Sequence, residues 1–229
     1  MNPLHLVVSL FAITFSCVAG DVAGHALITK KLTKKTLAPA VYSLRGTAPP
    51  VAPTAPVASG DSASEFDRMV VLLEGGPASP KPPVTVIIDQ RNMQFDPDLV
   101  VIPVGSSVEF PNSDPIFHNI FSLSRTGKFD LGYYPQGKSR TVRFDRPGIV
   151  QVYCHIHSNM YAAIVVTSSP WYTKPSADGS FSWSNIPAGH YKVMAWHKVA
   201  GLHETEIDVP ESGKVEVTLH VPVDVEPRP

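Results

Sequence analysis

Four residues in this chain could together bind a redox-active metal ion. Cys154, His157 and Met160 follow one another at the spacing C-x2-H-x2-M, and His118 lies upstream. They offer a thiolate, a thioether and two imidazoles. Two His and one Cys in a plane, with a weak axial Met, are the ligands of an electron-transferring copper site. The residue types and their spacing therefore predict a site that exchanges single electrons at copper.

Each of these residues also has an ordinary structural interpretation. An isolated cysteine is often a small buried hydrophobe, His157 could lie on a surface loop, and Met160 could fill the core. Zinc is the alternative metal, but methionine is a poor zinc ligand, and structural zinc sites usually take more thiolate or imidazole. The combination of all four residues, with Cys154 at the end of a strand, favours copper.

Strands would have to position these residues. Val-rich alternating runs recur between residues 84 and 167, separated by turns at intervals typical of a Greek-key β-sandwich. The run Ile149–Tyr153 leads into Cys154, and Ala162–Thr167 leaves the loop. The chain has 23 prolines and 15 glycines and no long segment of helical period. We therefore expect an all-β protein whose sandwich holds His118 against the Cys154 loop.

The Cys154 loop resembles the copper loop of the cupredoxins, the small blue copper proteins that include plastocyanin and amicyanin. Its short spacing is most similar to that of amicyanin, and His118-Asn119 resembles the upstream His-Asn pair of the family. Three further segments are similar to cupredoxin sequence: Gln94–Pro97, Val108–Asn112 and Asp145–Gly148. The resemblance implies a cupredoxin copper-binding domain over residues 84–168.

The resemblance also implies a role for each site residue. His118, Cys154 and His157 would be the equatorial ligands of one type 1 copper ion, and Met160 the axial ligand. The side chain of Asn119 would hydrogen-bond across to the Cys154 loop. The function implied is one-electron transfer with a redox partner protein, which the sequence does not identify. A copper storage or delivery protein without redox turnover is the alternative.

Residues 175–223 differ in character from the preceding domain. Asp178–Phe181 and Ile186–Val193 resemble the second half of a transthyretin-like or carboxypeptidase-regulatory sandwich, which is an Ig-like β-sandwich. This half has too few strands to close a sandwich alone. We expect residues 21–75 to supply the others, from three candidate segments: Gly24–Thr29, Ala40–Leu44 and Met69–Leu73.

The placement of Met69–Leu73 decides between two architectures. If the copper domain is inserted between two halves of an outer sandwich, this apolar strand is buried. If two domains simply follow each other, it becomes an exposed apolar edge, which proteins avoid. We therefore favour the insertion. Residues 47–64, rich in Pro and Ala, would be a linker that cannot bury a core.

The N-terminus predicts export. Residues 1–20 contain an apolar run from Leu6 to Phe15 and end in small residues, as in a secretory signal peptide cleaved before Asp21. The mature protein would be periplasmic or secreted, and Cys154 would be its only thiol, which favours metal binding over a disulfide. The alternatives are an uncleaved membrane anchor and a lipoprotein with lipidated Cys17.

Charge and motifs argue against several other functions. The chain has 19 Lys+Arg and 20 Asp+Glu, so it offers no strongly basic face for nucleic acid. We find no nucleophile, carboxylate pair or phosphate-binding loop typical of an active site. We therefore predict no enzyme activity, no catalytic residue and no small-molecule substrate. Multicopper enzymes place a His-Cys-His run between metal centres, whereas Tyr153 precedes Cys154 here.

Three further histidines need an interpretation. Strand alternation points His155 away from the metal, so we expect it to be partly exposed and not a ligand. His197 and His203 are expected on the surface of a hairpin, with an accessory metal site as the alternative.

Overall fold

The computed structural model describes residues 19–28, 65–77 and 80–221. This part of the chain is almost entirely β, with one 3-10 turn, η1 (Glu65–Arg68), so the prediction of an all-β fold is confirmed. No helix in the described residues is long and apolar enough to cross a membrane. Residues 1–18, the candidate strand Ala40–Leu44 and the linker 47–64 lie outside the described residues.

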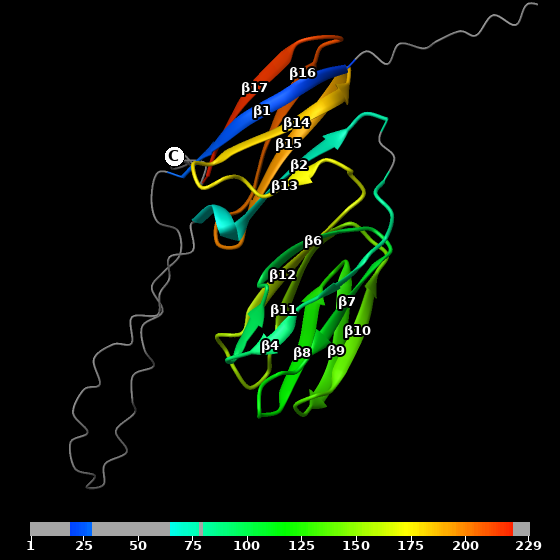
Figure 1. The fold of residues 1–229 in the computed structure, drawn as a ribbon, viewed down its shortest axis with the longest axis vertical. Coiled ribbons are helices and arrows are strands. Elements are labelled where there is room, and N and C mark those ends of the chain that lie inside the picture. Colours follow the sequence, from blue (N-terminus) through cyan, green and yellow to red (C-terminus); the bar gives the residue numbers. More distant parts are fainter. Residues whose placement is uncertain (1–18, 29–64, 78–79, 222–229) are drawn as a thin grey trace, which may run out of the picture.

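One sandwich, which we call the inserted sandwich, occupies the middle of the chain (Figure 1). Its larger sheet has the order β6-β12-β11-β8-β9 and its smaller sheet the order β10-β7-β3, beside the hairpin of β4 and β5. The large-sheet strands are β6 (Leu99–Pro103), β8 (His118–Ser124), β9 (Gly127–Tyr134), β11 (Gly148–Tyr153) and β12 (Tyr161–Thr167). The others are β3 (Thr85–Ile87), β4 (Asp89–Arg91), β5 (Gln94–Asp96), β7 (Ser106–Pro111) and β10 (Ser139–Phe144).

The second sandwich, which we call the outer sandwich, is built from both ends of the described chain. One sheet has the order β14-β1-β17 and the other the order β13-β2-β15-β16. Its strands are β1 (Ala19–Leu27), β2 (Met69–Gly75), β13 (Tyr172–Thr173), β14 (Ser180–Pro187), β15 (Gly189–His197), β16 (Gly201–Val209) and β17 (Lys214–His220). Because β1 and β2 precede β3 and the other strands follow β12, the inserted sandwich interrupts the outer one.

Strand β1 begins earlier than the sequence suggested. Ala19 and Gly20 pair with Pro187 and Ile186 of β14. A cleavage before Asp21 would therefore remove the first two positions of this strand.

The two sandwiches meet at a buried apolar seam. Val70, Leu72 and Trp196 of the outer sandwich cluster with three residues of the inserted one: Leu99, Ala163 and Val165. Lys198 reaches across the seam to the carboxylate of Asp98, and its ammonium lies 4.8 Å from the centre of the Tyr161 ring. The seam therefore holds the inserted sandwich to the outer sandwich by apolar packing and a buried cation.

We expect Trp196→Ala to lower the free energy of unfolding by about 3 to 5 kcal/mol, the usual cost of truncating a buried aromatic side chain. Trp196 is only 5% exposed at the seam. Leu202→Ala is the matched control, because Leu202 lies on the neighbouring strand β16 and is 49% exposed. Chemical denaturation measures both variants, and equal losses in the two would contradict the packing described here.

Candidate metal centre

Strands β8 and β11 bring the two parts of the site together. His118 is the first residue of β8, and Cys154 directly follows β11, which lies beside β8 in the large sheet. The chain then forms a loop over residues 154–160 before β12 begins. The backbone N–H of Met160 donates to the carbonyl of His157 at 3.0 Å, so this loop is closed tightly on itself.

Three donor atoms face one another at this point. The sulfur of Cys154 lies 3.9 Å from Nδ1 of His118 and 3.8 Å from Nδ1 of His157. The two Nδ1 atoms are 3.0 Å apart. These three residues form the only group of metal-ligating side chains found within the described ranges. His118 and Cys154 are buried, and His157 is partly exposed.

The spacing of these atoms fits a small first-row metal ion. Such ions bind imidazole nitrogen at about 2.0 Å and thiolate sulfur at about 2.3 Å, so three ligands in one plane lie about 3.5 to 3.7 Å apart. The observed separations of 3.0 to 3.9 Å are close to these values. One thiolate with two imidazoles is a donor set that suits copper.

Met160, the predicted axial ligand, is buried. It is 1% exposed and belongs to the same hydrophobic cluster as Cys154. Its place at the end of the loop agrees with the sequence spacing, whereas its role as axial ligand stays a prediction.

Asp114 supports the buried His118 ring, a role that sequence analysis did not identify. Its Oδ2 lies 2.9 Å from Nε2 of His118, and its two oxygens accept the backbone N–H groups of Asn92 and Met93 at 2.6 and 2.8 Å. Burial raises the pKa of Asp114, but the hydrogen bonds from Met93, His118 and Asn92 outweigh it and lower the pKa overall. The carboxylate is thus a stable acceptor for the ring N–H.

Asn119 does not make the contact that the family resemblance implied. Its amide nitrogen donates to Oδ1 of Asp130 at 2.7 Å, and its own oxygen has no hydrogen-bond partner among the described residues. His155 is partly exposed, as expected, and is not part of the group of three donors. Its ring stacks on Phe121 at 3.9 Å, and its side chain is 44% exposed.

The prediction that His197 lies on the surface is wrong. His197 is fully buried, and its Nδ1 accepts the backbone N–H groups of Val199 and Ala200, each at 3.1 Å. Its Nε2 lies 3.3 Å from a carboxylate oxygen of Glu65, and burial lowers its pKa. His197 therefore stabilises the turn between β15 and β16. His203 also contacts this turn, at the carbonyl of Ala200.

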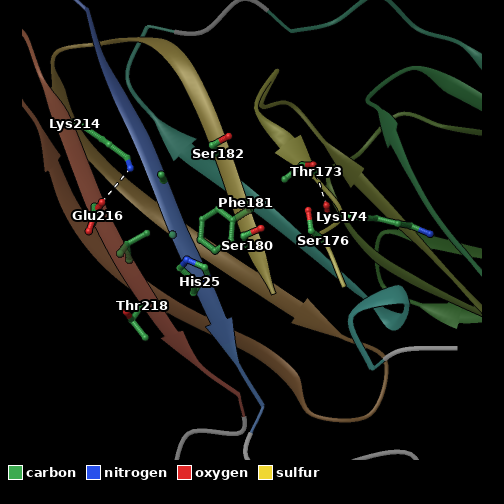
Figure 2. Close-up of a pocket in the computed structure, with 13 residues that line it drawn as sticks. His25, Thr173, Lys174, Ser176, Ser180, Phe181, Ser182, Lys214, Glu216 and Thr218 are labelled. Carbon is green, nitrogen blue, oxygen red and sulfur yellow. Dashed lines mark hydrogen bonds and ion pairs between the residues drawn. The ribbon is translucent and has the colours of Figure 1, made fainter. Parts of the chain in front are cut away.

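A polar pocket of about 510 Å³ lies on the outer sandwich (Figure 2). His25 and several hydroxyl side chains line it, and Lys214 pairs with Glu216 at its edge. None of the predicted metal ligands lines this pocket.

Comparisons with known proteins relate the inserted sandwich to a family of copper-binding proteins. Residues 83–167 match the family model of copper binding proteins of the plastocyanin/azurin family. The search of curated proteins found no match. The transthyretin-like character of the outer sandwich stays a prediction, because the family match includes none of its strands.

Several solved structures are similar to the chain. A Cu(I) structure of an amicyanin mutant is 17% identical, covers 36% of this chain and 82% of its own, and has a TM-score of 0.35. A purple cupredoxin from Nitrosopumilus maritimus is 28% identical over 33% of this chain and 84% of its own, with a TM-score of 0.30. A copper-containing nitrite reductase from Thermus scotoductus SA-01 is 28% identical over 41% of this chain and 24% of its own, with a TM-score of 0.34. The family match supports a copper-binding cupredoxin domain over residues 83–167 of this chain.

Proposed function

We propose that this chain is an exported type 1 copper protein that carries single electrons. His118, Cys154 and His157 would be the equatorial ligands of one copper ion, and Met160 the axial ligand. One observation carries the proposal: the sulfur and the two Nδ1 atoms face one another within 3.9 Å. The family match of residues 83–167 supports copper as the metal.

Bound copper would supply a one-electron couple between Cu(I) and Cu(II), and the chain would hold the donors fixed. His118 is fixed by β8 and Asp114, and Cys154 by the end of β11. Burial of both residues excludes water from that side of the site. Rigid ligands limit the rearrangement that accompanies electron transfer.

The partly exposed His157 gives the site one edge near solvent. Phe117 and Ile156, each adjacent in sequence to a proposed ligand, are 56% and 50% exposed. We propose that a redox partner protein contacts the molecule here, because exposed apolar side chains around a site favour protein contact. The proposed role is that of an electron carrier rather than an enzyme, in the periplasm or outside the cell.

We expect Cys154→Ser to abolish the visible absorption band that arises from charge transfer between thiolate and Cu(II). The purified copper-loaded protein should be intensely coloured and should undergo reversible one-electron reduction, whereas the variant should be colourless with an unchanged far-ultraviolet circular dichroism spectrum. Full colour in the variant would contradict the ligand assignment. Tight binding of Cu(I) alone, without the band in the unaltered protein, would instead indicate copper storage or delivery.

Replacing the two loop histidines separately tests which one binds the metal. We expect His157→Ala to weaken Cu(II) binding by at least about tenfold and to change the paramagnetic-resonance spectrum, because an equatorial ligand is lost. His155→Ala is the matched control, since its ring lies in the same loop but stacks on Phe121. Chelator competition measures both affinities. An equal loss in the two variants would contradict the separate roles assigned to these residues.

A further inference from the structure

The turn between β4 and β5, Asn92–Met93, contacts both parts of the proposed copper site. Its two N–H groups donate to the carboxylate of Asp114, which in turn contacts the ring of His118. The carbonyl of Met93 accepts a hydrogen bond of 3.1 Å from the side chain of Asn159. Asn159 lies within the 154–160 loop, so one turn is linked to both the upstream histidine and the loop of Cys154.

The backbone of this turn has an unusual conformation. Asn92 and Met93 have φ values of 56° and 54°. Two successive residues with positive φ are typical of the type I′ turn in two-residue hairpins. Asn adopts this conformation readily, whereas a Met there is uncommon. Such a conformation persists where the surrounding contacts hold it in place, and here the contacts are those to Asp114 and Asn159.

Asp114 is itself held on its other side. Its backbone N–H donates to the side-chain oxygen of Asn112 at 3.0 Å. Asn112 is 1% exposed, and its amide nitrogen donates to the carbonyls of Ile116 and Tyr134. The carboxylate therefore has a fixed position relative to the segment that leads into β8.

We propose that Asp114 is a positioning residue for the metal site, and that the Asn92–Met93 turn is a brace that fixes the His118 ring relative to the 154–160 loop. This inference rests on the proposed function. By accepting the N–H at Nε2, Asp114 selects the tautomer of His118 whose Nδ1 carries the lone pair facing Cys154. A carboxylate acceptor also makes the imidazole a stronger ligand, which stabilises Cu(II) more than Cu(I).

The first experiment uses the full chain with Asp114→Asn and Asp114→Ala. We expect each variant to bind Cu(II) about 10- to 100-fold more weakly, the usual loss when a group that orients a ligand is removed. The reduction potential should rise by about 59 mV for each tenfold loss that affects Cu(II) alone. Asp145→Asn is the control, because Asp145 is an exposed carboxylate paired with Arg143 on the same sandwich.

A second measurement separates positioning from general stability, and it needs no copper. In the metal-free protein, nitrogen-15 chemical shifts should show His118 protonated at Nε2, and this tautomer should become mixed in Asp114→Ala. The near-isosteric Asp114→Asn keeps the measurement possible if the alanine variant does not fold. Asn159→Ala should leave the tautomer unchanged and speed copper dissociation, because it releases only the loop from the brace.

The outcomes distinguish the two proposals. If the unaltered protein binds no copper, the proposed function fails, while the tautomer measurement still tests the positioning role of Asp114. If both Asp114 variants keep the tautomer and the copper affinity of the unaltered protein, Asp114 is not a positioning residue and the inference is overturned.

Discussion

The pairing of β8 with β11 is the constraint on which the candidate metal centre depends. Tyr153 pairs with Phe121, and this register places Cys154, one residue beyond β11, next to His118 at the start of β8. A slip of one residue would turn every side chain of a strand to the opposite face. It would move His118 out of the buried layer that also holds Cys154. The apolar core between the two sheets fixes this register and thereby the distance between thiolate and imidazole.

The inserted architecture explains two strands that do not alternate. In β2, Met69, Val71 and Leu73 face the core of the outer sandwich, whereas Val70 and Leu72 face the seam. Strand β12 shows the same division, with alternate residues in the core of the inserted sandwich and in the seam. Both faces of β2 and of β12 are thus covered, which explains why each strand is a continuous apolar run in the sequence. The inserted sandwich is packed against the outer sandwich along β12, the strand that directly follows the 154–160 loop.

The sequence predicted the donor residues because their chemistry lies in their types and spacing, and His118, Cys154 and His157 do come together. The contacts of Asp114 could not be predicted in this way, because they depend on the backbone of a turn more than twenty residues away. His197 was misplaced for a similar reason. A histidine in a hairpin is expected to be polar and exposed. His197 is nevertheless buried, because two backbone N–H groups and the carboxylate of Glu65, far upstream in the sequence, interact with its ring nitrogens. Fold class follows from local pattern, whereas hydrogen-bond partners follow from tertiary placement.

The geometry of the three donors has an electrostatic consequence of its own. In the tautomer of His118 that we propose, the proton lies on Nε2 and is directed at Asp114. Nδ1 then presents a lone pair to the Nδ1 of His157 at 3.0 Å and to the Cys154 sulfur. Electron-rich atoms held this close in a buried site repel one another unless a proton or a metal cation lies among them. The fold opposes this repulsion with a packed core and with a carboxylate that accepts three donors. A site held in this way favours a cation because the protein, before any metal binds, already bears the cost of bringing the ligands together.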